Sequence, residues 1–151
     1  MSKDKAIFAA GCFWGVEEFF SKIDGVISTK VGYSGGNTNN PTYEEVCRDN
    51  TGHAECILIN FDTNTISYKT LLKYFWKCHD PTILNRQGKD IGTQYRSAIF
   101  YFDKKQEIIA LNSKKEASLN YENSIVTEIN KASKFFDAED YHQEYLKKIT
   151  K

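Results

Sequence analysis

Residues 6–23 of this chain read AIFAAGCFWGVEEFFSKI, and this stretch decides how the fold begins. The short apolar run favours a buried strand, which we place at residues 5–10. The run that follows it favours a helix, which we place at residues 13–23. Cys12 therefore falls at a strand-to-helix turn.

The position of Cys12 suggests a reactive thiol. Backbone N–H groups at the start of a helix are unpaired, and the helix dipole favours negative charge there. A thiol in that place tends toward the thiolate, which is its reactive form, and Phe13 and Trp14 would form an apolar wall beside it. The alternative is a buried and inert cysteine, because free cysteines often only pack in cores.

The remainder of the chain alternates between strand and helix patterns. We expect strands at residues 26–33, 53–61, 96–102 and 124–129, and helices at residues 41–48, 67–78, 104–119 and 138–149. The polar stretch at residues 79–94 is expected to be a long loop, and such loops in compact domains are usually functional. This alternation predicts an α/β or α+β sandwich around one mixed sheet.

Length and composition restrict the class of protein. The 151 residues suit one domain spanning residues 1–151, and the formal net charge of zero argues against general nucleic-acid binding. No stretch resembles a secretory signal or a membrane span, so we expect a cytoplasmic protein that does not bind membranes and keeps its thiols reduced. The four cysteines, Cys12, Cys47, Cys56 and Cys78, form no C-x-x-C pair, which argues against a dithiol redox motif or a zinc site.

Four polar residues are candidates for a site shared with Cys12. Glu55 stands in an otherwise apolar strand, where it is either an exposed residue or a desolvated acid with a raised pKa. Tyr43 and Tyr95 either donate hydrogen bonds through their hydroxyls or simply pack. Asp90 lies in the long loop, where capping a turn is the commonest role of an aspartate.

Residues 11–15 (GCFWG) resemble the signature of the peptide-methionine sulfoxide reductase family, A type. Further blocks resemble that family in the same order and cover nearly the whole chain: residues 31–36 (VGYSGG), 40–47 (NPTYEEVC), 51–55 (TGHAE), 79–82 (HDPT), 85–97 (NRQGKDIGTQYRS) and 138–143 (AEDYHQ). With this resemblance, the expected fold is α+β, a two-layer α/β sandwich with a central mixed β-sheet and a ferredoxin-like core flanked by helices.

The resemblance implies a role for each candidate through its position in these blocks. Cys12 would be the nucleophile that becomes a sulfenic acid, and Glu55 the acid that protonates the sulfoxide oxygen. The remaining implied roles are hydrogen bonding to that oxygen by Tyr43 and Tyr95, organisation of the site through water by Asp90, and an apolar pocket for the S-methyl group by Phe13 and Trp14.

The resemblance also implies a substrate and a reductant. The substrate would be methionine-S-sulfoxide, free or in proteins, and its reduction would repair oxidative damage. No metal, flavin or nicotinamide is implied, and the reductant would be an external thiol, thioredoxin or glutathione acting with glutaredoxin.

The cysteines depart from the pattern of many relatives, which carry recycling cysteines in a C-terminal tail. This sequence has no cysteine after Cys78, so we expect a one-cysteine enzyme. The alternative is that an internal cysteine resolves the sulfenic acid: Cys47 shares a helix face with Tyr43 and would lie near the site if Tyr43 does, whereas Cys78 ends a helix and has no predicted place. Cys56 should point to the side of its strand opposite Glu55.

Two other functions stay open on the residues alone. A cysteine hydrolase or acyltransferase would need a histidine base beside Cys12, and His53 and His79 are available, although structural roles are commoner for both. A peptide-binding module would use the aromatic pocket without turnover. His142, in the last expected helix, is predicted to be a surface residue.

Overall fold

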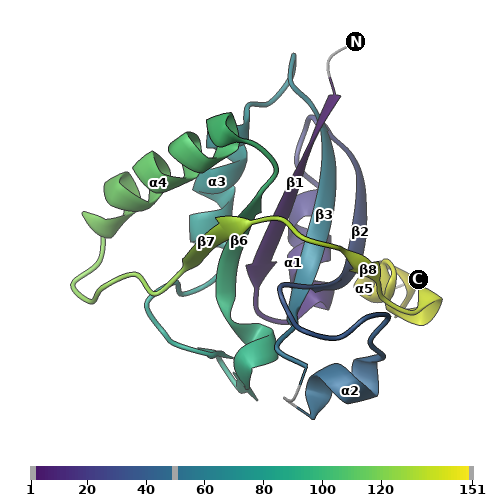
Figure 1. Ribbon diagram of the computed structural model, residues 1–151. Helices are drawn as coiled ribbons and strands as arrows, with labels where there is room; N and C mark the ends of the chain where they lie inside the picture. The colour runs from purple at the N-terminus through teal and green to yellow at the C-terminus, as the bar shows by residue number, and fades with distance from the viewer. Residues whose placement is uncertain (1–2, 49–50, 150–151) are drawn as a thin grey trace.

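A six-stranded sheet forms the centre of the computed structural model, which describes residues 3–48 and 51–149 (Figure 1). In sheet order its strands are β7 (Glu128–Lys131), β6 (Ser97–Tyr101), β1 (Lys3–Ala10), β3 (Ala54–Asp62), β2 (Val26–Ser34) and β8 (Phe136–Asp137). Within the described residues β6 and β7 pair in parallel and the other neighbours pair antiparallel, so the sheet is mixed.

Helices and a small hairpin complete the described elements. The helices are α1 (Phe13–Ser21), α2 (Tyr43–Cys47), α3 (Tyr68–Lys77), α4 (Lys104–Ser118) and α5 (Tyr145–Ile149); the hairpin is β4 (Arg86–Gln87) with β5 (Asp90–Ile91); and two 3₁₀ helices span Thr93–Tyr95 and Asp140–His142. The order β6-β1-β3-β2, with α1 after β1 and α3 after β3, is the ferredoxin-like arrangement. The predicted α+β sandwich with a mixed sheet is confirmed.

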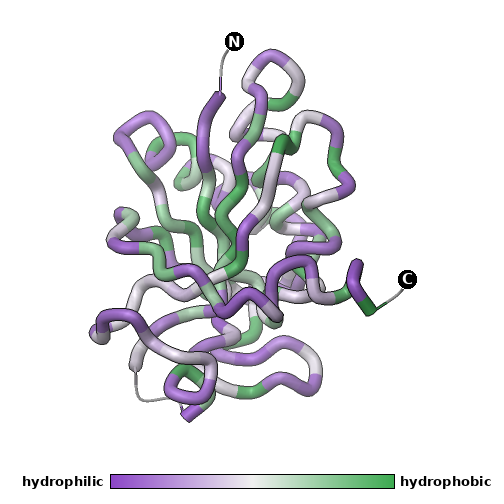
Figure 2. The backbone as a smooth tube through the Cα atoms, turned by 90° about the vertical axis from the view of Figure 1, so that its right-hand side faces the viewer, coloured by the Kyte–Doolittle hydropathy of each residue, from purple (hydrophilic) through white to green (hydrophobic). Residues whose placement is uncertain are grey.

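One face of the sheet packs against α1, α3 and α4 and forms the main core. Strand alternation puts Ile57 and Ile59 of β3 on this face. The ring of Phe8 in β1 lies 5.7 Å from that of Phe20 and 5.0 Å from that of Phe75, between centroids. Figure 2 shows hydrophobic residues concentrated along the central strands. This core holds β1 and α1 together on either side of their connecting turn.

The other face of the sheet is covered by chain that crosses from β7 to β8 (Figure 1). Ala132 and Phe135 of this crossing pack against the cluster that contains Cys56 and Ala98. Cys56 therefore lies on the face opposite Ile57, as expected from its place next to Glu55. The crossing also delivers the C-terminal residues to the β2 edge of the sheet, where they contact α1.

The C-terminal region differs from the expected helix over residues 138–149. It follows the end of β8 and forms a 3₁₀ helix and the short α5, and Glu144 between the two helices has a positive φ of 52°, which interrupts a continuous helix. The Gln143 side chain accepts from the Val31 N–H at 2.9 Å and donates to the Val31 carbonyl at 2.8 Å. Tertiary contacts with β2 therefore override the local helical pattern. The strand expected at 124–129 is also shifted, since β7 begins at Glu128.

Two other boundaries differ for local reasons. Helix α2 begins at Tyr43 rather than at residue 41, because Thr42 is its N-cap. Thr42 Oγ1 accepts from the Glu45 N–H at 3.2 Å, and the Glu45 carboxylate accepts from the Thr42 N–H at 2.9 Å, which is a capping box. The expected loop at 79–94 contains the β4–β5 hairpin and the start of the first 3₁₀ helix, which ends at Tyr95.

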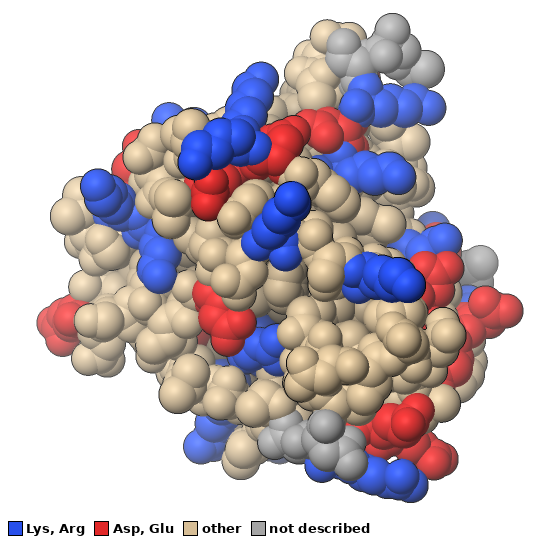
Figure 3. Space-filling view, in the orientation of Figure 1, with Lys and Arg blue, Asp and Glu red and all other residues tan. Residues whose placement is uncertain are grey.

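Charges of both signs are interspersed over the face of the molecule in Figure 3, in keeping with the formal net charge of zero. Among the described helices, none has the length and apolar character needed to cross a membrane.

Candidate active site

Cys12 lies at the turn between β1 and α1, as the sequence predicts. Gly11 before it has a φ of +97°, a left-handed conformation that favours glycine. A Cβ at this position would also meet the Gln87 side chain at 3.0 Å. Cys12 is half-buried and is the N-cap residue of α1, although its side chain makes no capping hydrogen bond. The turn thus fixes the thiol near the β4–β5 hairpin.

Glu55 lies on β3 and is 1% exposed, so the alternative of an exposed strand residue is wrong. Its Oε1 accepts a hydrogen bond from the Phe13 N–H at 3.1 Å. Its Oε2 is buried and has no hydrogen-bond partner in the part of the chain that the structure describes. Because burying an unpaired carboxylate oxygen is costly, this atom requires a proton or a ligand.

Burial sets the protonation of Glu55. Loss of hydration raises the pKa of this carboxyl to about 8, while the Phe13 N–H lowers it and the charge of Asp90 raises it. The group therefore keeps its proton through most of the neutral pH range. A buried carboxylic acid of this kind is suited to donating a proton.

The expectation of a thiolate at Cys12 is wrong for the resting protein. Burial is the largest effect, and with the charges of Glu55 and Asp90 it raises the pKa of the Cys12 thiol to about 11. The N–H groups of Trp14 and Gly15 lower this pKa, so the helix-start effect is present but smaller. The resting site thus holds a neutral thiol beside a neutral carboxylic acid.

Tyr43, Tyr95 and Asp90 reach the site from three different elements. Tyr43 begins α2, Tyr95 ends a 3₁₀ helix and Asp90 begins β5. Burial is the main cause that raises the pKa of both tyrosines, and the charge of Glu55 contributes in each case. The charges of Asp90 and Cys12 also raise the pKa of Tyr95. Since such effects decline with distance, the candidates are gathered at one place, and both phenols remain protonated donors.

Aromatic rings form one side of this place. Phe13 is 1% exposed, and its ring centroid lies 5.7 Å from that of Tyr33 and 6.4 Å from that of Tyr43. Trp14 is half-buried and stacks on Tyr145 of α5, with 4.0 Å between centroids and 15° between planes. The Trp14 ring also lies 6.4 Å from that of Tyr43. Phe13 and Trp14 therefore pack into one aromatic cluster with residues of α2 and α5, next to Cys12 in the chain.

The C-terminal segment supplies residues that the sequence analysis did not assign to the site. His142, expected at the surface, is fully buried, and its Nδ1 accepts from Trp14 Nε1 at 2.9 Å. Glu139 accepts from the Tyr33 hydroxyl at 3.0 Å and from the Tyr43 N–H at 3.1 Å. Both lie in the block at residues 138–143 that carries the family resemblance, which was the available signal. The expected helix at residues 138–149 led away from this signal, because a helical pattern predicts that these polar residues face solvent.

The other two histidines have structural partners. The His79 ring nitrogens lie 2.8 Å from the Phe75 carbonyl and 2.7 Å from Ser97 Oγ. His53 Nδ1 accepts from the Gly36 N–H at 3.0 Å. Within the described residues no histidine is hydrogen-bonded to Cys12, so the structure gives no support to a cysteine hydrolase. No group of three or more metal-ligating side chains occurs among the same residues.

Comparison with known proteins identifies the family of this chain. A family model described as "Peptide methionine sulfoxide reductase" matches residues 4–151. The peptide methionine sulfoxide reductase MsrA of Methanosarcina acetivorans is 56% identical over 147 residues, which cover 96% of this chain and 78% of the relative. The MsrA of Clostridium perfringens (strain 13 / Type A) is 54% identical over 144 residues, covering 95% of this chain and 92% of the relative.

Solved structures show the same fold. Reduced Mxr1 from Saccharomyces cerevisiae superposes with a TM-score of 0.94 at 34% identity, covering 99% of this chain and 87% of that one. Methionine sulfoxide reductase A of Corynebacterium diphtheriae gives a TM-score of 0.88 at 35% identity, covering 97% and 74%. With the family model matching nearly every residue, the chain belongs to the peptide methionine sulfoxide reductase family, oxidoreductases that return methionine sulfoxide to methionine in the repair of oxidative damage.

Proposed function

We propose that Cys12 is the nucleophile and Glu55 the proton donor in the reduction of methionine-S-sulfoxide, free or in proteins, by this chain as one catalytic domain. The observation that carries the assignment is the buried Oε2 of Glu55, which has no partner among the described residues and belongs to an acid that is protonated at neutral pH. The N–H of Phe13, the residue after Cys12, donates to the other oxygen of this acid. A sulfoxide oxygen is a poor leaving group until it is protonated, so the reaction needs this acid next to the thiol.

In the proposed first step, the Cys12 sulfur attacks the sulfoxide sulfur and forms an S–S bond, while the sulfoxide oxygen takes the proton of Glu55. The thiol proton passes to Glu55 and replaces the one that it gave up. The S–O bond of the substrate and the new S–S bond then break as the hydroxyl passes to the Cys12 sulfur. Cys12 becomes a sulfenic acid and is oxidised by two electrons, and the substrate becomes methionine and is reduced by two.

The remaining assignments concern the substrate's orientation. Tyr43 and Tyr95 would donate hydrogen bonds to the oxygen, because raised pKa values keep both phenols protonated. Asp90 would organise the site through water, and Phe13 and Trp14 would hold the S-methyl group. Donors on one side and an apolar wall on the other distinguish the two epimers, and the family resemblance favours the S epimer.

We also propose that an external thiol, thioredoxin or glutathione with glutaredoxin, reduces the Cys12 sulfenic acid. Cys56 is fully buried on the far face of the sheet, and Cys78 Sγ donates to the Phe75 carbonyl at 3.2 Å. One structural relative, 26% identical with a TM-score of 0.70, is Mxr1 from Saccharomyces cerevisiae in complex with Trx2, which supports thioredoxin. All four cysteines are free, which suits a reducing compartment such as the cytoplasm.

The assignment of the nucleophile is tested by Cys12→Ser. Without any reductant, the wild type should release one equivalent of methionine from a methionine-S-sulfoxide substrate, and the R epimer should give none. The serine variant should release none, since a hydroxyl is far less nucleophilic than a thiol here. Full release by the serine variant would overturn the proposal, and binding of sulfoxide without release by the wild type would favour the peptide-binding alternative.

A further inference from the structure

Among the described residues, the Trp14 side chain makes one hydrogen bond. Its Nε1–H donates to His142 Nδ1 at 2.9 Å, while one face of its ring stacks on Tyr145. Stacking contacts the ring without choosing between two orientations about χ2, because this torsion in tryptophan is broad and roughly two-fold. A hydrogen bond from the indole nitrogen does choose, since the nitrogen lies on one edge of the ring only.

His142 is enclosed by aromatic rings where it accepts this hydrogen bond. It is fully buried, with ring centroids of Tyr141, Tyr43 and Phe13 at 4.1, 4.4 and 5.2 Å. A neutral imidazole that accepts at Nδ1 carries its proton on Nε2. That Nε2 is buried and has no hydrogen-bond partner among the described residues. In the orientation that accepts from the indole, the imidazole therefore leaves its own N–H without a hydrogen bond.

The two residues that follow His142 are both fixed by hydrogen bonds. Gln143 is hydrogen-bonded to the N–H and carbonyl of Val31 in β2, and Glu17 of α1 accepts from the Glu144 N–H at 2.6 Å. Glu17 lies one helical turn after Trp14 in α1. The same helix that carries the indole therefore also anchors the segment that carries its acceptor.

We propose that His142 is a positioning residue, which holds the Trp14 indole in the orientation that receives the substrate's S-methyl group. It acts through Trp14 and touches no reacting atom. The proposal rests on the assignment of Trp14 to the substrate pocket. It predicts that losing the acceptor weakens capture of the sulfoxide while Cys12 and Glu55 keep their chemistry.

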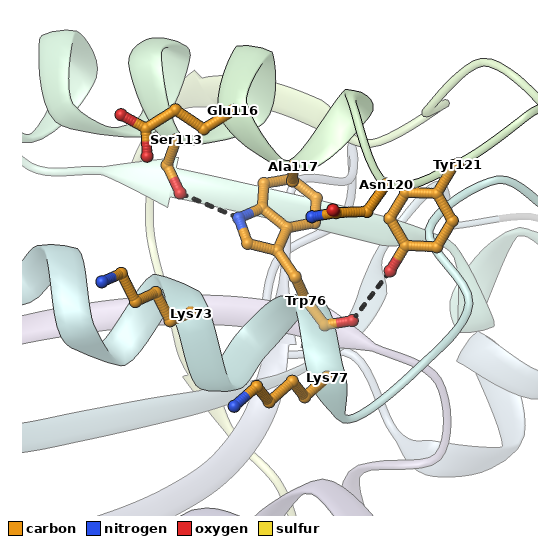
Figure 4. A pocket seen from close by; sticks show the side chains of 8 residues that line it. All are labelled: Lys73, Trp76, Lys77, Ser113, Glu116, Ala117, Asn120 and Tyr121. Atoms are coloured by element: carbon orange, nitrogen blue, oxygen red, sulfur yellow. Dashed lines mark hydrogen bonds between the residues drawn. The ribbon is translucent and has the colours of Figure 1, made fainter.

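The chain offers a matched control. Its second tryptophan, Trp76, donates from Nε1 to Ser113 Oγ at 2.8 Å (Figure 4). This pair lies between α3 and α4, at a hollow of about 310 Å³ whose lining contains none of the candidate site residues. Ser113→Ala thus removes an acceptor from a buried indole without touching the site, and it reports what such a loss does to stability alone.

The test compares His142→Leu, His142→Asn and Ser113→Ala by methionine release without reductant, measured over a range of methionine-S-sulfoxide concentrations. His142→Leu should raise the half-saturating concentration about tenfold, the scale of one net hydrogen bond, with a smaller change in the saturated rate. His142→Asn should recover most of this loss, because its Oδ1 occupies the place of Nδ1. Ser113→Ala should lower the melting temperature and leave the half-saturating concentration unchanged.

Two results would overturn the positioning role: an unchanged half-saturating concentration in His142→Leu, or an equal rise in Ser113→Ala. They differ from failure of the proposed function, which would show as full release by Cys12→Ser whatever His142 does.

A second measurement does not depend on the folding of His142→Leu. With Trp76→Phe, Trp14 is the only indole, so its fluorescence reports its surroundings. Burial lowers the pKa of His142, with Glu139 opposing, and protonation in acid would replace the acceptor by an N–H. Glu139, Tyr141 and Tyr43 lie around the His142 ring, and Glu17, Glu18 and Glu144 line a hollow with Trp14. An acid transition in emission that His142→Asn abolishes supports the proposal, and one that persists there belongs to one of these carboxyl groups and counts against it.

Discussion

At the scale of single residues, the site depends on two groups whose pKa values are both raised. Burial is the first cause for Cys12 and for Glu55, and each outweighs opposing backbone N–H groups. For a nucleophile this is a disadvantage, since less thiolate is present at neutral pH. For an acid it is an advantage, because an ordinary glutamate would have lost its proton well below pH 7. Under the proposed assignment, the resting site therefore favours protonation of the sulfoxide oxygen over a preformed thiolate.

This protonation predicts the pH dependence of methionine release. The acid form of Glu55 is present below its pKa of about 8 and is lost above it, so the rate at saturating sulfoxide should fall as pH rises through 8. Glu55→Gln keeps a side chain that can accept from Phe13 but has no acidic proton. It should be about 10²–10⁴-fold slower and should lack this alkaline limb. A wild-type rate that climbs steadily between pH 8 and 10 would contradict the assignment, because control by the Cys12 thiolate would then dominate.

At the scale of elements, the site is assembled where short, irregular pieces meet the end of β1. The thiol lies at the β1–α1 turn, Asp90 and Tyr95 come from the segment that contains the β4–β5 hairpin, and Glu139 and His142 come from the C-terminal segment. Each piece is held by contacts to another element rather than by its own propensity. Small changes in the turn should therefore affect both stability and chemistry.

Two glycines close to the turn give opposite predictions for stability. Gly11→Ala should destabilise the protein by about 1–2 kcal/mol, since its φ is +97° and its Cβ would crowd Gln87. Gly15 lies in α1, and a Cβ there meets nothing within 4 Å, so Gly15→Ala should stabilise by up to about 1 kcal/mol. Urea unfolding of both variants gives the comparison. Equal stability of Gly11→Ala and the wild type would show that the turn tolerates a side chain.

At the scale of the whole molecule, the sheet separates the cysteines. Cys56 is buried behind the sheet, whereas Cys47 is exposed at the end of α2, and a hydrogen bond with the thiol of Cys47 contributes to the raised pKa of Tyr43. Among Cys47, Cys56 and Cys78, Cys47 is therefore the one that contacts a candidate site residue. Reduction by an external thiol alone requires that Cys47 forms no disulfide with Cys12.

Mass spectrometry after oxidation by substrate alone decides this point. With one-cysteine chemistry, the protein should gain one oxygen, located on Cys12 by trapping the sulfenic acid. Cys47→Ser should behave identically, which makes it the control. A stoichiometric loss of two hydrogens, with Cys12 linked to Cys47, would contradict reduction by an external thiol alone, and Cys47→Ser would then abolish that product.

The sequence by itself determined the β-α start with Cys12 at its turn, the alternating strands and helices, and the family. These follow from local pattern and from residues close to one another in the chain. The tertiary structure alone decided that Cys12 rests as a thiol and that Glu55 keeps its proton. It also decided that the segment at 138–149 is not one continuous helix, and that His142 in this segment is buried and accepts a hydrogen bond from Trp14. The physical reason is that hydration and hydrogen-bond partners depend on which distant residues enclose a group. The local sequence pattern does not show which distant residues enclose a group. The helix start therefore predicted a thiolate at Cys12, whereas burial raises the pKa of the thiol and keeps it protonated.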